Sequence, residues 1–217
     1  MRLLIAGTAA ALLALTNPVT AQEKPSEEGF YPLFDGKTLN GWQGGTDGYE
    51  VKDGVLICKP KGSGNLYTDK EYSNFVFRFE FKLTPGANNG IGIRTPMEGD
   101  SAFVGMEIQI LDDGHENYKG IKDYQTHGSV YGVIPAKRGF LKPTGEWNSE
   151  EITVDGTKVK VVLNGETIVD GDIAEARDNG TVDGKEHPGL SRDKGFIAFC
   201  GHGAPLEFRN IRIKELK

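Results

Sequence analysis

Residues 105–112 read Gly-Met-Glu-Ile-Gln-Ile-Leu-Asp, and this stretch alternates polar and apolar side chains. Glu107 and Gln109 fall on one face, and the apolar residues between and beside them fall on the other. This period of two is that of a half-buried β-strand, whereas an α-helix repeats every 3.6 residues. An acid beside an amide on one face of a sheet is typical either of a solvent-facing strand or of a polar cleft.

The other apolar runs of the chain also have the period of strands. Residues 74–83 read Asn-Phe-Val-Phe-Arg-Phe-Glu-Phe-Lys-Leu and place four phenylalanines on one face and mostly charged side chains on the other. Asp-Gly and Asn-Gly pairs mark two-residue hairpin turns. These signals predict a hairpin over 49–58 with its turn at 53–54, a meander over 150–170 with turns at 155–156 and 164–165, and short strands at 65–68, 90–94, 128–133, 195–200 and 206–214.

No helix of ordinary length is predicted, and residues 172–177 are expected to form one helical turn. Many short strands separated by turn residues indicate an all-β sandwich or jelly roll.

Two features of this sheet protein suggest a site. Strand 90–94 contains two glycines, which often mark the close approach of a ligand or another backbone. The polar segment 112–128 is long for a connection inside a compact domain, and such loops are often functional.

The first residues have the pattern of an export signal. Arg2 precedes an apolar run from Leu3 to Leu15, and small residues at Val19 and Ala21 fit a cleavage site. The run is too short for a membrane span. We therefore expect a signal peptide over 1–21, a polar lead-in over 22–29 and one domain over 30–217, in a protein exported to the periplasm or the cell exterior.

The composition excludes some partners. The formal net charge is −6 and no basic cluster is present, which argues against nucleic acid as a partner.

The two cysteines, Cys58 and Cys200, could form one disulfide in an oxidising compartment or remain buried free thiols. They have no zinc-site spacing.

Seven short motifs occur in order along the chain. They are FDGKTLNGW at 34–42, NNGIGIR at 88–94, EIQILD at 107–112, GSVYG at 128–132, GEWN at 145–148, HPGL at 187–190, and GHG at 201–203 running into FRNIRI at 208–213. Together they resemble the 3-keto-disaccharide hydrolase domain family, over essentially the whole chain from residue 30. Many members read Gln-Asp-His-Gly where residues 200–203 read Cys-Gly-His-Gly, so the acid beside His202 is missing here.

The resemblance implies a concanavalin A-like jelly roll of two antiparallel sheets, and an exported enzyme that cleaves glycosides already oxidised to a ketone at sugar carbon 3. Such a ketone makes the hydrogen on carbon 2 acidic. A base can remove it, the enolate can expel the group on carbon 1, and water can then add. This route needs a base, a donor for the enolate oxygen and an acid for the leaving oxygen.

Several polar residues could fill these roles. Glu107, His127 and His202 are the candidates for base and acid. Arg94 could stabilise the enolate or bind a pair of hydroxyls through its planar fork, and Tyr131 could donate to the leaving oxygen.

Other polar residues are candidates for substrate binding or for a metal. Gln109, Asn89 and Trp147 are predicted to bind the sugar. No cofactor is required by the pattern, but a divalent metal could replace Arg94 as the electrophile. Its candidate ligands are Glu107, Asp112, His115 and His127.

Two other functions use the same fold. A retaining endo-glucanase carries Glu-x-Asp-x-x-Glu on one strand, and the same offsets here give Glu107, Gln109 and Asp112. Retention needs two carboxyl groups about 5–5.5 Å apart, and the shorter Asp112 makes that reach harder. A non-catalytic sugar-binding module would need aromatic platforms and polar groups, but no base.

Overall fold

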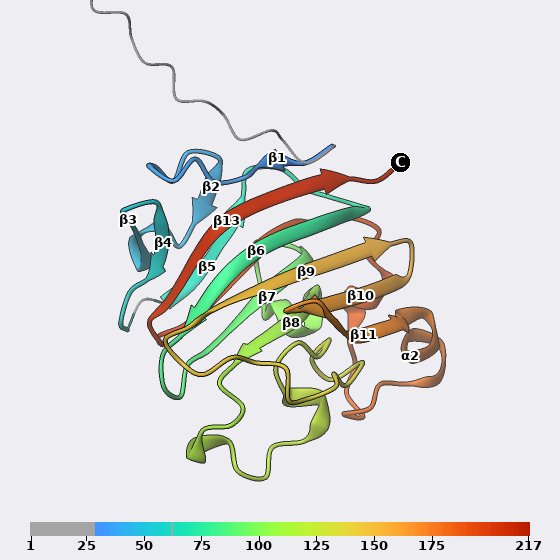
Figure 1. The fold of residues 1–217 in the computed structure, drawn as a ribbon. Helices are drawn as coiled ribbons and strands as arrows, with labels where there is room; N and C mark the ends of the chain where they lie inside the picture. The colour runs from blue at the N-terminus through green and yellow to red at the C-terminus, as the bar shows by residue number, and fades with distance from the viewer. Residues whose placement is uncertain (1–28, 62) are drawn as a thin grey trace, which may run out of the picture.

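The computed structural model describes residues 29–61 and 63–217, so the expected signal peptide and nearly all of the lead-in lie outside the described residues. Two antiparallel sheets pack face to face as a jelly-roll sandwich (Figure 1), which confirms the predicted fold class. Among the described residues, no helix is long and apolar enough to span a bilayer.

The larger sheet has the strand order β11-β10-β9-β6-β13-β4-β3, with β1 paired to β13. Its strands are β1 (Tyr31–Pro32), β3 (Tyr49–Lys52), β4 (Val55–Cys58), β6 (Phe75–Leu83), β9 (Trp147–Asp155), β10 (Lys158–Leu163), β11 (Glu166–Asp172) and β13 (Leu206–Glu215).

The smaller sheet has the order β2-β5-β12-β7-β8, so β8 is an edge strand. Its strands are β2 (Trp42–Gly44), β5 (Ser63–Thr68), β7 (Asn88–Thr95), β8 (Met106–Leu111) and β12 (Phe196–His202). The described helices are short: α1 (Ser101–Val104), α2 (Ile173–Asn179), and the 3-10 turns η1 (Thr46–Gly48), η2 (Glu116–Tyr118), η3 (Asp123–Gln125) and η4 (Pro188–Ser191).

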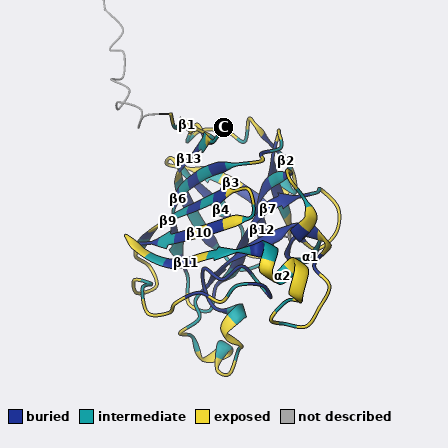
Figure 2. Ribbon diagram, turned by 90° about the vertical axis from the view of Figure 1, so that its right-hand side faces the viewer, coloured by how far each residue is buried: buried dark blue, intermediate teal, exposed yellow. Residues whose placement is uncertain are grey.

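The core lies between the two sheets and is rich in phenylalanine. Along β6 every second residue is buried, as the sequence pattern predicts (Figure 2). Phe79 packs against Phe208 of β13 and Phe199 of β12, and the rings of Phe199 and Phe208 lie 4.3 Å apart between centroids. Each fully buried phenylalanine contributes about 1.5–3 kcal/mol to folding, so this aromatic cluster holds the two sheets together.

The predicted hairpin turns are largely confirmed. Asp53-Gly54 joins β3 to β4 and Asn164-Gly165 joins β10 to β11, and all four residues have positive φ, as a type I′ turn requires. The turn between β9 and β10 is one residue later than predicted. Asp155 pairs with Lys158, so the loop is Gly156-Thr157, with φ of 58° at the glycine.

The helical turn expected at 172–177 is α2, which Asp172 caps by accepting a hydrogen bond from the Ala174 N–H. The strand predicted at 128–133 is not a regular strand. Val130 makes isolated bridges to Ile108 and Ile134, because the backbone turns back on itself at 130–134.

Residues 127–131 nevertheless cover the free edge of β8. Tyr131 N–H donates to the Glu107 carbonyl at 2.9 Å, Gln109 N–H donates to the Ser129 carbonyl at 3.0 Å, and Gly128 N–H donates to the Gln109 carbonyl at 2.7 Å. Uncovered edge strands present unpaired backbone groups to other chains. This segment therefore completes the smaller sheet beside β8.

Both cysteines are buried free thiols, which answers the question that the sequence leaves open. Cys58 belongs to the main core cluster between the sheets, and Cys200 packs with Tyr67 and Ala198 on the opposite face of the smaller sheet. Burial raises the pKa of both thiols.

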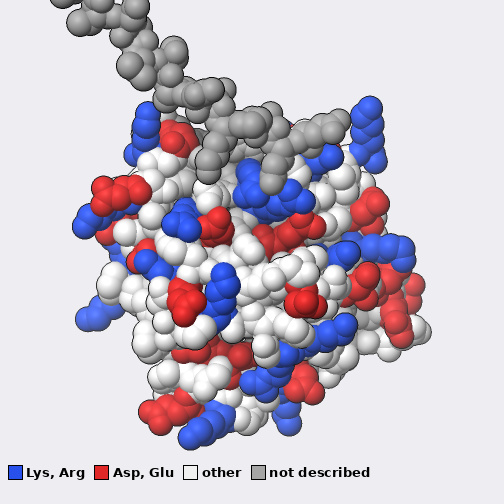
Figure 3. Space-filling view, in the orientation of Figure 1, with Lys and Arg blue, Asp and Glu red and all other residues white. Residues whose placement is uncertain are grey.

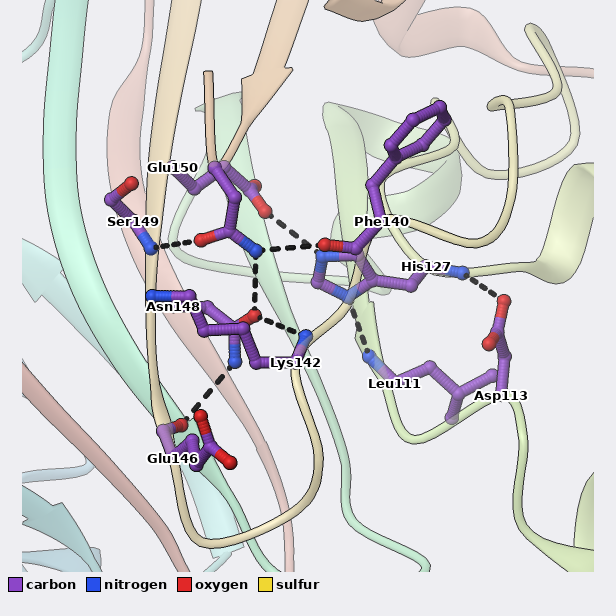
Figure 4. Close-up of polar contacts among 10 residues, drawn as sticks. Leu111, Asp113, His127, Phe140, Lys142, Glu146, Asn148, Ser149 and Glu150 are labelled. Carbon is purple, nitrogen blue, oxygen red and sulfur yellow. Dashed lines mark hydrogen bonds and ion pairs between the residues drawn. The ribbon is translucent and has the colours of Figure 1, made fainter. Parts of the chain in front are cut away.

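A buried polar contact connects the segment beside β8 to the larger sheet (Figure 4). His127 Nδ1 accepts the Leu111 N–H at 3.2 Å, so the ring donates through Nε2 to Glu150 Oε2 at 3.0 Å. The ring also packs on Phe81, with centroids 5.2 Å apart. Among the described residues, Glu150 Oε1 has no hydrogen-bond partner. The Glu150 carboxylate is therefore buried with few hydrogen-bond donors around it.

We expect His127→Ala to destabilise the protein by about 3–5 kcal/mol, because it leaves the Glu150 carboxylate buried without its histidine donor. Urea unfolding would measure this loss. The double variant His127→Leu/Glu150→Leu buries no charge and should lose clearly less. An equal loss in the two variants would show that the unpaired carboxylate is not the cause.

Candidate functional site

The outward face of the smaller sheet brings polar residues of four strands into register. One row across the sheet runs from Glu107 on β8 through Gly92 and Ala198 to Tyr67 on β5. The next row runs from Gln109 through Gly90 and Cys200 to Asn65. The two middle strands therefore carry only small residues between polar residues on either side.

Gly90 makes room for the carboxylate of Glu107. A Cβ atom at residue 90 would lie 1.8 Å from Glu107 Oε1 and 2.5 Å from its carboxyl carbon. The acid of β8 thus lies across β7, over the glycine of the neighbouring strand. This close approach is the physical reason for a glycine at residue 90 of the glycine-containing strand 90–94.

The Glu107 carboxylate faces His202 at the end of β12. Oε1 lies 3.5 Å from His202 Nε2, and it has no hydrogen-bond partner within the described part of the chain. Glu107 is 5% exposed, whereas about half of the His202 side chain is open to solvent. A buried acid therefore meets an accessible imidazole on one face of the sheet.

The charge of Glu107 sets the titration of His202. The neighbouring carboxylate raises the pKa of His202 above its usual value, against the opposing effect of desolvation, and Asp100 adds to the increase. The contact stabilises the fold only while His202 is protonated. Its contribution is therefore present below the ordinary histidine pKa and is lost as the pH rises through the raised pKa.

Two further sets of polar side chains lie beside the Glu107–His202 pair, and the sequence analysis identified only some of their residues. Gln109 Nε2 donates to Asn88 Oδ1 at 3.2 Å. On the far side, Asn65 Nδ2 donates to Tyr67 Oη at 3.1 Å and to Ser101 Oγ at 3.0 Å. The paired asparagines of motif 88–94 were a signal for Asn88, but nothing in the sequence pairs β5 with the start of α1.

Tyr131 lies beside Glu107 through its backbone, as described above, and its ring packs edge-on against Tyr124. Its hydroxyl accepts a hydrogen bond from Gln125 Nε2 at 3.1 Å. Of the predicted site residues, the structure thus brings together Glu107, His202 and Gln109, with Tyr131 alongside β8.

The structure places His127, Arg94 and Asn89 away from this group. His127 is buried between the sheets, on the other face of β8. The Arg94 guanidinium donates to the carbonyls of Ser73 and Arg192 and to Asn74 Oδ1, and burial lowers its pKa. Asn89 alternates with Gly90 and faces the interior, where its Oδ1 accepts the Gly90 N–H.

Trp147 lies on the outer face of the larger sheet. The Arg209 guanidinium carbon lies 3.9 Å and Lys82 Nζ lies 4.9 Å from its ring centroid. Figure 3 shows acidic and basic side chains interleaved on this side of the molecule, where Lys82 pairs with Glu207 and Arg209 with Glu80. Trp147 therefore packs under two cationic side chains on the larger sheet, whereas Glu107 lies on the smaller sheet.

The proposed metal ligands are not gathered. Asp112 Oδ2 accepts the Gly86 N–H at 2.8 Å, and His115 Nδ1 accepts the Asn117 N–H at 3.3 Å. Within the described residues, no three His, Cys, Asp or Glu side chains form a group that could hold a metal ion. β8 pairs with β7 without a register shift, and residues five positions apart on such a regular strand face opposite sides of the sheet. The structure therefore does not bring Asp112 to Glu107 as a second glycosidase carboxylate either.

The segment around His187 fixes α1 against the sheet. His187 Nδ1 donates to the Ala102 carbonyl at 3.0 Å and Nε2 lies 3.1 Å from Asp183 Oδ2. Although burial opposes the shift, hydrogen bonds from the Lys185 backbone, His187 and Thr181 lower the pKa of Asp183. The motif 187–190 thus holds the helix whose first residue, Ser101, reaches Asn65.

Comparison with known proteins identifies a family for this chain. The model of the 3-keto-alpha-glucoside-1,2-lyase-like domain matches residues 29–214. A 3-keto-disaccharide hydrolase of Bacteroides thetaiotaomicron is 29% identical, and the match covers 87% of this chain and 79% of that protein.

Solved structures share the fold. A crystal structure from Parabacteroides distasonis, described as a candidate glycosyl hydrolase, superposes with a TM-score of 0.76 at 31% identity, covering 86% of this chain and 99% of that one. A Bacillus subtilis protein with a galectin-like fold superposes with a TM-score of 0.56 at 10% identity, covering 86% of this chain and 94% of that one. The latter is a likeness of fold alone.

We expect Gly90→Ala to push the Glu107 carboxylate away from His202, because the added methyl would occupy the position of Oε1. The pKa of His202, followed by NMR titration, should then fall from its raised value toward the ordinary value of about 6.5. Gly114→Ala is the matched control, since a Cβ there meets nothing within 4 Å. An unchanged His202 pKa in Gly90→Ala would contradict the role given to this glycine.

Proposed function

Because the chain belongs to the 3-keto-alpha-glucoside-1,2-lyase-like domain family, it is a carbohydrate-active enzyme, and we propose that it cleaves glycosides carrying a ketone at carbon 3. The observation that carries the proposal is the buried carboxylate of Glu107 facing the half-exposed His202 at 3.5 Å. One base and one acid on the same face are what an elimination requires.

In the proposed reaction Glu107 removes the proton from carbon 2, next to the ketone. The electron pair forms an enolate with its charge on the ketone oxygen. The enolate then re-forms the ketone, the double bond shifts to carbons 1 and 2, and the bond from carbon 1 to the leaving oxygen breaks. His202 in its protonated form donates a proton to that oxygen, so the products are an alcohol and an enone.

Water then adds to carbon 1 of the enone, and a proton returns to carbon 2. The sum of the two steps is hydrolysis, which fits both the lyase in the family description and the hydrolase activity in the name of the Bacteroides relative. The raised pKa of His202 supports its role, because more of the ring remains protonated at neutral pH.

This route also does not need Asp112 as a second catalytic carboxylate. Conventional glycosidases use two carboxyl groups on either side of the bond, and Asp112 is engaged with the Gly86 backbone. The ketone of the substrate makes the hydrogen on carbon 2 acidic, so the reaction does not need that second carboxylate.

We expect the enzyme to cleave a 3-keto-glucoside and not the matching unmodified glucoside. In D₂O the released sugar should carry deuterium on carbon 2, as detected by mass spectrometry, because elimination breaks that C–H bond. Glu107→Gln should lower kcat by at least about 10²-fold, the typical value of a general base.

The control for this experiment is Glu166→Gln, an exposed glutamate at the start of β11. It should retain wild-type turnover. Cleavage of both sugars at similar rates, or release without deuterium on carbon 2, would refute the elimination.

We further propose that the protein is exported, as the sequence before residue 29 indicates. Expression in a Gram-negative host should give a mature protein that begins at Gln22, as determined by N-terminal sequencing of the periplasmic fraction. A mature protein that still begins at Met1 would contradict the proposal.

A further inference from the structure

The proposed elimination places three demands on the site in a fixed order. The sugar atoms follow one another as carbon 1 with the leaving oxygen, carbon 2 with the acidic hydrogen, and carbon 3 with the ketone. When the base is at carbon 2, the acid and the donor for the ketone oxygen must therefore lie on opposite sides of the base. This inference rests on the proposed function and asks which residue is that donor.

The sheet provides donors on both sides of the Glu107 carboxylate. That carboxylate lies over Gly90 of β7. His202 lies on β12, one strand to one side, and Gln109 lies on β8, one strand to the other side, in the same row as Gly90. Because His202 is the acid, carbon 1 faces β12 and the ketone faces Gln109 on β8, whose amide is bonded to Asn88 of β7.

We propose that the side-chain amides of Gln109 and Asn88 form the donor pair for the enolate oxygen. The bond from Gln109 Nε2 to Asn88 Oδ1 fixes both amides. It uses one of the four amide N–H groups and leaves those of Asn88 Nδ2 for the substrate. Preorganised neutral donors of this kind stabilise charge that develops in the transition state.

Neutral amides have an advantage over the arginine expected from the sequence. A guanidinium beside Glu107 would add a permanent positive charge to that of protonated His202 and make the carboxylate a still weaker base. Arg94 is instead occupied by Ser73, Asn74 and Arg192. The amide pair can hold the enolate oxygen and leave the carboxylate charge for the proton of carbon 2.

The same orientation places the leaving group. With carbon 1 at His202, the leaving sugar extends across β12 toward β5, where Asn65 is partly exposed and linked to Tyr67 and Ser101. Asn65 therefore contacts the leaving sugar, whereas the amide pair contacts the keto sugar. The two groups of polar residues have different roles in the same reaction.

The test uses 1,5-anhydro-glucitol oxidised to the ketone at carbon 3, a keto sugar without a leaving group. Its carbon 2 hydrogen can exchange with D₂O through the enolate, and proton NMR follows the exchange. This step needs the base and the enolate donor but not the acid. Gln109→Ala and Asn88→Ala should each slow it by about 10²–10³-fold, and Asn88→Asp, which keeps the shape but loses the donor, should be equally slow.

Three variants separate the roles. His202→Gln should exchange within a few-fold of wild type but cleave 3-keto-disaccharides slowly. Asn65→Ala should exchange normally and raise KM for the disaccharide. Asn179→Ala, an exposed amide at the end of α2, should match wild type in both assays. Urea unfolding would verify that every variant is folded.

The possible failures can be told apart. If wild type neither exchanges the analogue nor cleaves a 3-keto-glycoside, the proposed function is wrong. If wild type exchanges it and the Gln109→Ala and Asn88→Ala variants exchange it equally fast, the amide pair is not the donor while the proposed function stands.

Discussion

A carboxylate can lie across a neighbouring strand only if that strand leaves space for it, and the site depends on this steric constraint. Gly90 provides the space, and the acid of the edge strand reaches over it to the end of β12. The pairing of β7 with both β8 and β12 sets the rows in which Gln109 and Asn65 lie on either side. A side chain at residue 90 would separate the acid from the histidine without changing any backbone hydrogen bond.

In contrast to the Glu107–His202 pair on the outer face, the buried pair of Glu150 and His127 has a structural role. Glu150 is fully buried and His127 donates to it, although replacing such a pair with apolar residues often costs nothing. Since His127 also accepts from the Leu111 N–H at the end of β8, the pair fixes one end of that strand relative to the larger sheet. The polar residues that the sequence grouped together thus divide into two sets on opposite faces of β8.

Periodicity predicted the fold well, because burial of one sheet face imposes a period of two on the sequence. The faces of β6 and β8, two of the hairpin turns and the helical turn of α2 all follow from local residue patterns. The strand expected at 128–133 did not form as such, since Val130 bonds back to Ile134 and only the backbone of neighbouring residues follows β8. Pairing between distant segments is not encoded in local pattern.

The same limit applies to the site. Glu107 and Gln109 could be placed on one face because they lie two residues apart, but the alignment of His202 and Asn65 with them depends on strand order. Arg94 illustrates the converse. It lies only two residues after Gly92, yet a φ of 48° and three backbone and side-chain acceptors turn its guanidinium elsewhere. Proximity in sequence to a glycine-rich strand did not predict proximity to the acid.

The segment 127–131 that closes the edge of β8 has a consequence for how relatives can differ. It satisfies the backbone of the strand that carries Glu107, so the connection between residues 112 and 126 need not contribute hydrogen bonds to that strand. The length of that connection can change at little cost in free energy, provided that Asp113, Asp123 and Tyr124 keep their hydrogen bonds to residues 127–132. The strand that carries Glu107 keeps its place in such a change.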